Sequence, residues 1–429
     1  MQWRMSKKGR AMLKRKGAIG VVASAAMLLT ACSGGGGGDA ADGDVIKFGW
    51  LNGITGDYSS YYEPSQAAVT IAIDEINEAG GVLGKKVELV SADNLSTVEG
   101  AVQGFSRLVD VENVVAVGGV ESTGGLAILD SANELEIPVF CPGCGTPELD
   151  TGAGEFMFRL TGSDSDGGTI AAQFARDENI KRVAVMAQNT EGMSEPADIF
   201  KKVFVEGAGG EVVADVRFNP GRSSYQAELA QAFDAKPEAV YLAAGHEAAS
   251  VIFREWQRRG YGGKFFVSPD LVTPPISALM PDLENGVAVG AIAAYDTESP
   301  AYKVFADKFQ AKTGNPPAAG VYDANQYDQY IALALAITKA QSTDGAAIAE
   351  AIPQVLNSGG VEVYSYTDGL KELEAGNEIN YHGASGSLDL NEHNNLAAPL
   401  FGEQFIIDRA WTQVDVIELD PALRKLVGD

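Results

Sequence analysis

Two of the three cysteines in the 429-residue chain, Cys141 and Cys144, stand in the stretch VFCPGCGTPEL with a Cys-x-x-Cys spacing. That spacing occurs in dithiol redox centres, in zinc sites and in local disulfides. A redox dithiol places its first thiol at a helix N-terminus, whereas Pro142 and Gly143 favour a turn. A zinc site needs further Cys or His ligands, and the sequence contains no second such pair. We expect a local disulfide between Cys141 and Cys144, with two free buried thiols as the alternative.

Motifs for catalysis and for cofactor binding are missing from the sequence. The three histidines, His246, His382 and His393, lie far apart, and none belongs to an H-x-x-x-H pair. The sequence has no Walker A motif, no G-x-G-x-x-G after its first predicted strand and no G-x-S-x-G nucleophile motif. Its abundant carboxylates are typical of a solvated acidic surface. We therefore expect a protein that is not an enzyme and has no metal site or cofactor.

The third cysteine, Cys32, follows a leader with the features of an export signal. Seven Lys and Arg residues and no acidic residue precede Cys32, and the uncharged run GAIGVVASAAMLL is too short to span a bilayer. The tetrapeptide LTAC that ends at Cys32 resembles the bacterial lipobox, which implies cleavage before Cys32 and lipidation of this residue. We expect a signal peptide over residues 1–31 and a Gly-rich flexible tether over 32–44. The mature protein would then be attached by lipids to the extracytoplasmic side of the cell membrane.

The predicted mature chain is strongly acidic. The whole chain has 32 Lys and Arg and 58 Asp and Glu, and removal of the seven basic residues of the leader leaves 25 against 58, a net charge of −33. Such a charge repels nucleic acids and anionic lipid headgroups. We therefore expect no nucleic-acid partner. The composition, 45% hydrophobic and 21% charged, is that of an ordinary globular protein.

From Val45 onward, apolar β-branched segments alternate with helical patterns. The first four predicted strands are VIKFGWL (45–51), KVELVSAD (86–93), NVVAVGG (113–119) and IPVFC (137–141). A second series comprises RVAVMAQ (182–188), EVVADVRF (211–218), AVYLAAG (239–245) and KFFVSPD (264–270). Between the strands lie amphipathic patterns such as SQAAVTIAIDEINEAGG, which is typical of a helix ended by glycine. Two such βαβ series predict an α/β fold with two doubly wound lobes and mostly parallel sheets.

Four loops that follow predicted strands are candidates for a ligand site. They are NGITGDYSSYYEP, GGVESTGG, CPGCGTPEL and SPDLVTPP. In open α/β sheets, ligands bind beyond the carboxyl ends of the strands. We therefore expect all four loops to open on a gap between the two lobes.

The chain resembles the type I periplasmic binding proteins of ABC importers, specifically their leucine/isoleucine/valine-binding branch. The matching segments, spread over about residues 45–410, are TGDYSSYYEPSQAAVTIAIDEINEAGGVLGKKVELVSAD, PGCGTPEL, FRLTGSDSDGG, NPPAAGVYDANQYDQYIALALAI and NYHGASGSLDLNE. The resemblance implies two Rossmann-like doubly wound lobes joined by three hinge crossovers, which are expected near Gly162, Ala291 and Tyr381. Lobe 1 would comprise residues 45–162 and 292–380, and lobe 2 would comprise residues 163–291 and 381–429.

Binding residues follow from the same resemblance. Family members that bind amino acids hold the ligand's α-carboxylate with Ser or Thr hydroxyls and backbone N–H groups at a helix start, and Ser122 and Thr123 match that position. The ligand's ammonium group meets an acidic side chain after a lobe-2 strand, where this chain has Asp270. Tyr61 and Tyr322 match aromatic positions that wall the cleft.

The loop after the fourth strand departs from the family pattern. Members of the family often have Thr in this loop at the position of Gly145, and here Thr146 follows instead. By its place beside the loop GGVESTGG, we expect Gly143, Gly145 and Thr146 to line the ligand cleft. The two cysteines would stiffen this wall.

Two positions of lobe 2 also depart from the family pattern. The family often has Tyr where this chain has Gly192 and Gly245. Loss of both rings would enlarge or reshape the pocket, and Met193 or His246 would then contact the ligand from the neighbouring positions.

The resemblance implies a solute-binding lipoprotein that captures a small polar ligand between its lobes and delivers it to the permease of an ABC importer. An amino acid, branched-chain or related, is the expected ligand, and the protein is expected to act as a monomer. An amide, urea or a small carboxylate is the alternative ligand for the same fold. A ligand-sensing module for a membrane receptor is the alternative function.

Overall fold

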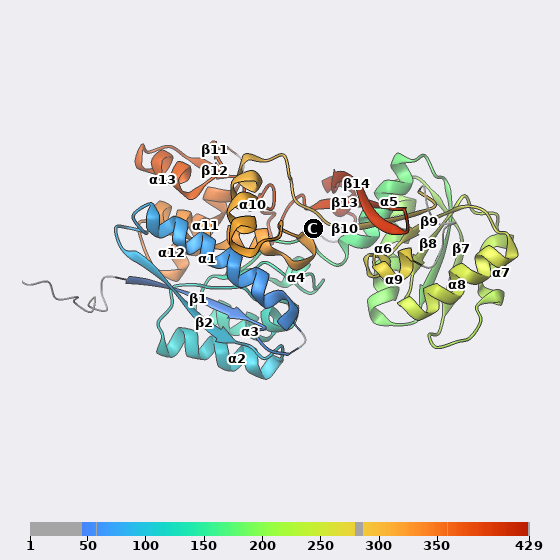
Figure 1. The fold of residues 1–429 in the computed structure, drawn as a ribbon, viewed down its shortest axis with the longest axis horizontal. Helices are drawn as coiled ribbons and strands as arrows, with labels where there is room; N and C mark the ends of the chain where they lie inside the picture. The colour runs from blue at the N-terminus through green and yellow to red at the C-terminus, as the bar shows by residue number, and fades with distance from the viewer. Residues whose placement is uncertain (1–44, 57, 279–285, 358, 428–429) are drawn as a thin grey trace, which may run out of the picture. The chain divides into compact units, whose positions relative to one another are not determined.

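The structure is a computed structural model that describes residues 45–56, 58–278, 286–357 and 359–427. The predicted signal peptide, the tether and the lipidation site Cys32 lie outside these ranges. Within them the chain forms two large sheets, and helices cover both faces of each sheet (Figure 1). None of the helices in these ranges is long and apolar enough to cross a membrane. The predicted fold class, two α/β lobes with largely parallel sheets, is confirmed.

The first sheet has five parallel strands in the order β2-β1-β3-β4-β5. They are β1 (Val45–Asn52), β2 (Lys86–Asp93), β3 (Val117–Gly118), β4 (Val139–Cys141) and β5 (Met157–Arg159). The direction of winding reverses between β1 and β3. The carboxyl ends of these two strands therefore form the edge at which a doubly wound sheet binds ligands.

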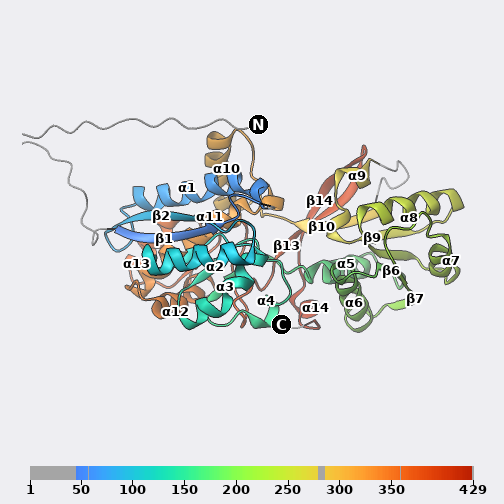
Figure 2. The same ribbon diagram turned by 90° about the horizontal axis from the view of Figure 1, so that it is seen from below.

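Helices lie on both faces of the first sheet, as Figure 2 shows for α1 and α11 on one side and α2 and α3 on the other. The bounds are α1 (Tyr62–Glu78), α11 (Asp323–Ala340), α2 (Val98–Ser106) and α3 (Ser122–Glu134). In β1, Phe48 and Trp50 belong to the core beneath α1 and α11, whereas Leu51 belongs to the core beneath α2 and α3. Because both faces of the strand are covered, the adjacent residues Trp50 and Leu51 are both apolar, and polar and apolar residues do not alternate along the strand.

Helix α1 forms where its apolar periodicity predicts it. Val69, Ile73 and Ile76 are all buried against the sheet. The helix ends before Gly80 and Gly81, whose φ angles are +106° and +79°. Any other residue at Gly81 would place its Cβ 1.9 Å from the carbonyl oxygen of Lys85, so this turn needs glycine.

The remaining helices and the small sheet of lobe 1 complete its core. They are α10 (Pro300–Thr313), α12 (Gly345–Leu356), α13 (Tyr366–Glu374), and the parallel pair β11 (Val361–Val363) and β12 (Ile379–Tyr381). Helix α11 is buried along nearly its whole length. It therefore forms the centre of this lobe, with neighbouring helices around it.

The second sheet has seven strands in the order β14-β13-β10-β9-β8-β6-β7. They are β6 (Arg182–Gln188), β7 (Glu211–Phe218), β8 (Ala239–Ala243), β9 (Lys264–Val267), β10 (Ala288–Ala293), β13 (Leu400–Ile407) and β14 (Ala410–Glu418). Strands β6 to β10 are parallel, and β13 and β14 add an antiparallel hairpin at one edge. The expected parallel series is thus extended by two C-terminal strands.

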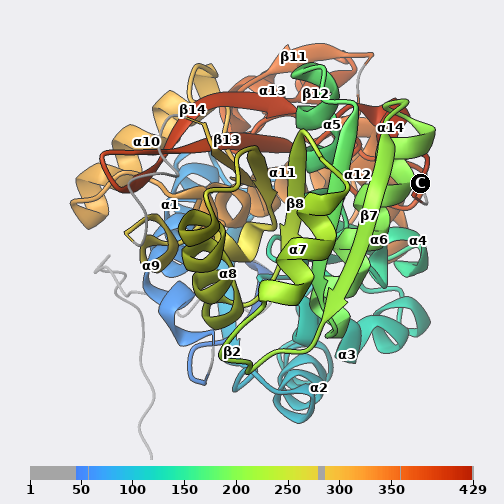
Figure 3. The same cartoon turned by 90° about the vertical axis from the view of Figure 1, so that its right-hand side faces the viewer.

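Helices α7 (Gln226–Asp234) and α8 (His246–Arg259) cover one face of the second sheet, toward the viewer in Figure 3. Helices α5 (Asp166–Asp177) and α6 (Glu191–Glu206) pack against the other face. Short helices α4 (Leu149–Gly152), α9 (Pro274–Ser277) and α14 (Pro421–Arg424) lie in loops or near the C-terminus.

Within the residues that the structure describes, the chain passes between the two sheets three times. The first passage joins β5 to α5 and contains Gly162, where a crossover is predicted. The second follows β10, which contains Ala291 and ends at Ala293. The lobe bounds drawn at Gly162 and Ala291 stay predictions.

The third passage lies later in the chain than Tyr381. The hydroxyl of Tyr381 donates a hydrogen bond of 2.8 Å to Asp328 Oδ1 in α11, and this tyrosine is fully buried in the core of lobe 1. Leu388 and Leu396 belong to the same core, whereas Phe401 belongs to the core of lobe 2. Residues 382–396 therefore pack with lobe 1, and the chain crosses after Leu396 because the buried Asp328 fixes the preceding segment.

Candidate functional site

A cavity of about 190 Å³ lies beyond the carboxyl ends of β1, β3 and β4. Its walls come from the ends of these strands and the segments that follow them. The lining residues there are Asn52, Gly53, Tyr58, Tyr61 and Ser65, then residues 119–122, and then Gly143 and Gly145. Asp164 of the first passage and residues 321–326 at the start of α11 complete it. We refer to this cavity as the lobe-1 pocket.

Three tyrosines form one side of the lobe-1 pocket. The ring of Tyr61 lies 6.3 Å from that of Tyr58 and 6.3 Å from that of Tyr322, measured between centroids. Tyr322 has a φ angle of +59° and links a 3₁₀ turn (Ala319–Val321) to α11. Burial, the charge of Asp164 and the two other tyrosines raise the pKa of Tyr322 to about 12. The hydroxyl of Tyr322 is therefore protonated at neutral pH and can donate a hydrogen bond.

Two buried polar side chains in the lobe-1 pocket have an atom without a hydrogen-bond partner. The amide nitrogen of Asn52 donates to the carbonyl oxygen of Gly119 at 2.9 Å, which fixes the orientation of the amide and leaves Asn52 Oδ1 unpaired. Ser65 Oγ, in the first turns of α1, is also unpaired. Asn52 is 6% exposed and Ser65 is 0% exposed. An unpaired buried polar atom costs about 1–3 kcal/mol, so both atoms are predisposed to bind a ligand group.

Two carboxylates give the lobe-1 pocket a negative charge. Glu121 precedes α3 and caps it, since its carboxylate accepts hydrogen bonds from the backbone N–H of Gly124 (2.6 Å) and from Asn94 Nδ2 (3.0 Å). Burial raises the pKa of Glu121 despite these bonds. Asp164 also lines the pocket, and its backbone N–H donates to Gly145 O at 2.6 Å. Among the residues that the structure describes, no Lys, Arg or His lines this pocket.

Gln326, which lines the pocket, belongs to a chain of hydrogen bonds between buried amides. Gln326 Oε1 accepts hydrogen bonds from Trp50 Nε1 (3.3 Å) and from Gln329 Nε2 (2.7 Å). Gln329 Oε1 in turn accepts from the backbone N–H of Gly119 at 2.8 Å. This chain of bonds ties α11 to the ends of β1 and β3, so the polar groups of the pocket are held on regular elements.

The cysteine loop forms another wall of the lobe-1 pocket. Cys141 and Cys144 are joined by a disulfide. Their sulfur atoms lie 3.6 and 3.7 Å from the carbonyl oxygen of Val120, directly before α3. A Cβ on Gly125 in the first turn of α3 would lie only 3.0 Å or less from either sulfur. The disulfide therefore packs tightly against the start of α3.

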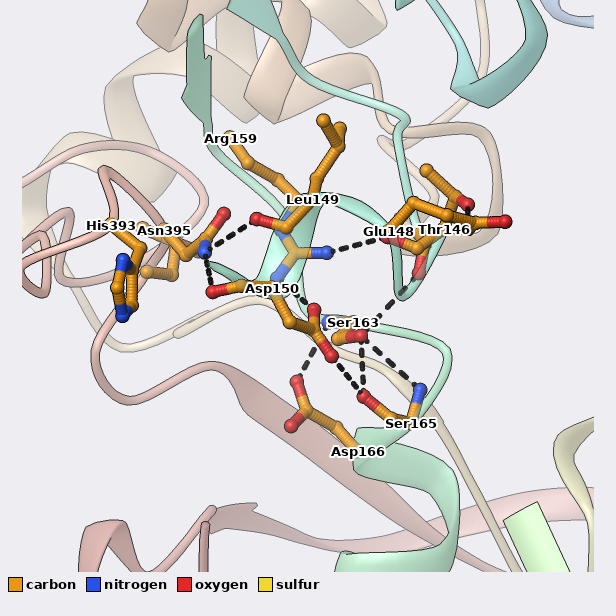
Figure 4. A network of polar contacts seen from close by, with 12 residues as sticks. Thr146, Glu148, Leu149, Asp150, Arg159, Ser163, Ser165, Asp166, His393 and Asn395 are labelled. Atoms are coloured by element: carbon orange, nitrogen blue, oxygen red, sulfur yellow. Dashed lines mark hydrogen bonds and ion pairs between the residues drawn. The ribbon is translucent and has the colours of Figure 1, made fainter. Parts of the chain in front are cut away.

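A buried polar network holds this loop against the first passage between the sheets (Figure 4). Arg159 is fully buried, donates to Thr146 O at 3.1 Å and pairs with Asp150 at 2.5 Å. Ser165 Oγ donates to the other carboxylate oxygen of Asp150 at 2.6 Å and lies 2.7 Å from Ser163 Oγ. The network therefore fixes the position of the passage that carries Asp164.

The same passage is tied to the C-terminal end of the chain. Asp166, at the start of α5, is fully buried and pairs with Arg424 of α14 at 3.0 Å. Burial raises the pKa of Asp166 to about 6, and the charge of Arg424 opposes that rise. Arg424 also donates to the carbonyl oxygen of Leu396, next to the third passage. Two of the three passages are thus joined through one buried ion pair.

A second cavity, of about 470 Å³, lies along the passages between the sheets. Its lining includes residues 161–165, 291–293 and 399–401, together with Met193 and Pro269. Asp164 and Tyr322 line this cavity as well as the lobe-1 pocket, so the two cavities share a wall.

Half of the ligand residues expected from the sequence come together in the lobe-1 pocket. They are Tyr61, Ser122, Gly143, Gly145 and Tyr322. Three of the four strand-end loops named from the sequence thus contribute to one cavity. No ligand contact tests these assignments, and they stay predictions.

Four other expected residues, Thr123, Thr146, Met193 and His246, are not among the described residues that line the lobe-1 pocket. Thr123 is the second residue of α3, and the hydroxyl of Thr146 donates to the carboxylate of Glu148. Met193 lines the second cavity, and His246 Nε2 lies 3.0 Å from Thr273 Oγ1 at the surface. Asp270 belongs to a 3₁₀ turn (Pro269–Leu271), and its side chain lies outside what the structure describes.

Several pocket residues were not named from the sequence. Asn52, Ser65, Glu121 and Asp164 all line the pocket without having been singled out, as does Tyr58. Asn52 could have been found as the polar residue that ends an otherwise apolar strand. No comparable signal distinguishes Ser65 or Asp164 from other residues of their loops.

A sequence model of the family described as "Periplasmic binding protein" matches residues 45–361. The chain belongs to this family. The match covers the first sheet, strands β6 to β10 of the second sheet and all three loops that line the lobe-1 pocket. In periplasmic binding proteins of this fold, the edge of the sheets where the pocket lies is the place expected for a ligand.

Named members of this family show similarity over most of the chain. The leucine-, isoleucine-, valine-, threonine- and alanine-binding protein of Pseudomonas aeruginosa is 25% identical over 309 residues, 72% of this chain and 82% of that protein. A Leu/Ile/Val-binding protein of Rhizobium johnstonii is 27% identical over 315 residues, 73% of this chain and 84% of the relative. The crystal structure of a leucine-binding protein from Thermotoga maritima superposes with a TM-score of 0.62 at 25% identity, covering 87% of this chain and 98% of the other.

Proposed function

We propose that this periplasmic binding protein captures a small amino compound, an amino acid of the branched-chain or a related type, and delivers it to the permease of an ABC importer. The observation that carries the proposal is the lobe-1 pocket, in which Asn52 Oδ1 and Ser65 Oγ are buried without partners. In a chain of this family, such a site at the carboxyl ends of the strands is suited to bind a polar solute.

The proposed mechanism is capture by closure. The ligand first binds in the lobe-1 pocket. Residues of lobe 2 then contact the rest of the ligand, and the candidates for these contacts are Met193, His246 and Asp270. Closure is favoured because the ligand makes more contacts in the closed form than in the open form. The buried pair of Asp166 and Arg424 lies at the passages on which such a motion depends. The permease would recognise the closed form, and no bond of the ligand is made or broken.

The names of the relatives support an amino acid as the ligand. Two of them are named for binding leucine, isoleucine and valine. Amides, urea or small carboxylates remain the alternative ligands on this fold. A sensory role is the alternative function, and it would require a membrane receptor in place of a permease.

The leader sequence is the basis for a proposal about where the protein lies in the cell. We propose that the chain is exported, cleaved before Cys32 and attached by lipids to the extracytoplasmic side of the cell membrane. Intact mass spectrometry of the membrane fraction tests this point. A mature N-terminus at Cys32 that carries acyl chains is expected, and an unmodified N-terminus upstream of Cys32 would contradict it.

Native mass spectrometry of the purified protein, followed by calorimetric titration of the co-purified compound, tests the function. We expect one small molecule per chain and saturable binding with 1:1 stoichiometry. If neither the co-purified fraction nor a panel of amino acids, amides, urea and small carboxylates binds, the proposed function is wrong. Chemical conversion of a bound compound would also contradict the proposal, because it would show that the protein is an enzyme.

A further inference from the structure

The lobe-1 pocket has the charge and the polar groups of a site for cations. Glu121 and Asp164 both line it, and no basic side chain lines it among the residues that the structure describes. The free atoms of Asn52 and Ser65 are oxygens, and the first is a pure hydrogen-bond acceptor. The two carboxylates and Asn52 Oδ1 offer acceptors to a ligand group that enters this pocket, and the hydroxyls of Ser65 and Tyr322 can either donate or accept.

The start of α3 is poorly suited to a ligand carboxylate. The N-terminus of a helix attracts anions because it has unpaired N–H groups and a positive dipole end. Here the carboxylate of Glu121 already occupies that position and accepts from Gly124 N at 2.6 Å. A second carboxylate at Ser122 would lie next to that of Glu121, and like charges at close range repel each other. The assignment of the ligand's carboxylate to Ser122 and Thr123 is thus disfavoured by a residue of the chain itself.

The orientation of Asn52 also favours a ligand group that donates hydrogen bonds. Its amide nitrogen is used by Gly119 O, so the side chain presents only oxygen to the pocket. An oxygen acceptor that is 94% buried needs an N–H or O–H donor from a ligand. A carboxylate group supplies none at neutral pH, whereas an ammonium group supplies three and a guanidinium group five.

We propose that the lobe-1 pocket takes the protonated nitrogen of its ligand, so that the solute class is an organic amine or guanidinium compound, amino acids included, which enters with its cationic end. This inference rests on the proposed function of solute capture, and it reverses the ligand orientation that the family resemblance implies. Asp164 supplies the charge, and Asn52 Oδ1 and Ser65 Oγ accept N–H groups. The rings of Tyr58, Tyr61 and Tyr322 form an aromatic wall of the kind that binds cations through their faces.

A matched set of solutes tests the inference on the purified full-length mature protein. 3-Methylbutylamine, 4-methylpentanoate and leucine share one branched skeleton and differ only in the charged groups they carry. Agmatine and arginine add a guanidinium group. Binding is measured by calorimetry and by thermal shift at low and at physiological salt. We expect the amines and the guanidinium compounds to bind at least tenfold more tightly than 4-methylpentanoate, with affinity that falls as salt rises.

The variant Asp164→Asn tests the assigned partner of the cation. We expect it to weaken binding of the amines about tenfold or more, while Asp307→Asn, which removes the same charge from the exposed face of α10, leaves binding unchanged. Tighter binding of 4-methylpentanoate than of the amine, or amine binding that is unaffected by Asp164→Asn, would overturn the inference while solute capture still stands. Absence of binding by every compound, the co-purified one included, would overturn both capture and the inference.

Discussion

The ring of Tyr61 lies 6.3 Å from the ring of Tyr322, with the two planes inclined by 42°. Tyr61 precedes α1, near the start of the folded chain, and Tyr322 precedes α11, far along the sequence. Helices α1 and α11 pack side by side over the first sheet, so their N-terminal ends meet at one edge of it (Figure 2). Two residues distant in sequence thereby form one wall of the lobe-1 pocket, and the consequences of this arrangement can be measured.

Gly145 is a position where a single methyl group should disturb the pocket. A Cβ on Gly145 would lie 2.1 Å from Asp164 Oδ1. Gly145→Ala should therefore displace Asp164 and weaken ligand binding about tenfold or more, as measured by calorimetry. Gly152→Ala is the control, since a Cβ there meets nothing within 4 Å. Equal affinities of the two variants would contradict the placement of Asp164 in the ligand site.

The disulfide between Cys141 and Cys144 makes a prediction about mass and stability. The intact mature protein should be two hydrogens lighter than its reduced form and should contain no titratable thiol at these positions. Because the bond closes a very short ring, replacing both cysteines with serine should cost only about 1–2 kcal/mol in the free energy of unfolding. Two reactive thiols in protein purified without reductant would show that the free-thiol alternative is correct.

The sequence predicted most of the regular structure. The strand boundaries of β2, β6 and β7 agree with the segments KVELVSAD, RVAVMAQ and EVVADVRF, each of which contains two or three valines, residues that favour strands. Strand β3 is shorter than NVVAVGG, with only Val117 and Gly118 paired. Local pattern fixes where a strand can lie, but pairing with a neighbour decides how long it is.

The third passage and part of the pocket could not be predicted in this way. Residues 382–396 pack with lobe 1 because the backbone N–H groups of Ala384 and Ser385 donate to the buried Asp328, 2.8 Å away in each case. That contact joins residues more than fifty positions apart, and no local pattern reports it. Glu121 was overlooked for a similar reason, since its role as the cap of α3 depends on where its side chain points.

Arg159 should be essential for the stability of the first passage. It is completely buried, and its loss would leave the Asp150 carboxylate without its cationic partner. Arg159→Met should lower the free energy of unfolding by about 3–5 kcal/mol, measured by denaturant titration. Arg222→Met, at a half-exposed ion pair with Glu228, should change it by less than about 1 kcal/mol. Comparable losses in the two variants would argue against the network of Figure 4.

The buried carboxyl of Asp323 should make stability depend on pH. Burial raises its pKa from the ordinary 3.8 to about 6, although Ala318 N, Tyr295 Oη and Ala324 N all donate to it. Since the folded state binds the proton more tightly than the unfolded state, this group's contribution is fully present below pH 4 and is lost as the pH rises through 6.

The variant Asp323→Asn isolates that contribution. The difference in the free energy of unfolding between wild type and variant should favour the wild type more at pH 4 than at pH 7.5, by at most about 3 kcal/mol. Asp166, whose pKa is raised to the same region, is present in both proteins and cancels in the comparison. A difference that does not vary with pH would show that Asp323 is not the group responsible.

The central claim is that the lobe-1 pocket is where the solute binds. Calorimetric titration of the wild type and of Tyr322→Ala with the co-purified solute tests it most directly, with Tyr322→Phe as the variant that keeps the ring. The account predicts 1:1 binding by the wild type, a loss of at least tenfold in affinity for Tyr322→Ala, and a smaller loss for Tyr322→Phe. An unchanged affinity in Tyr322→Ala, with the variant folded as judged by its melting temperature, would contradict the claim.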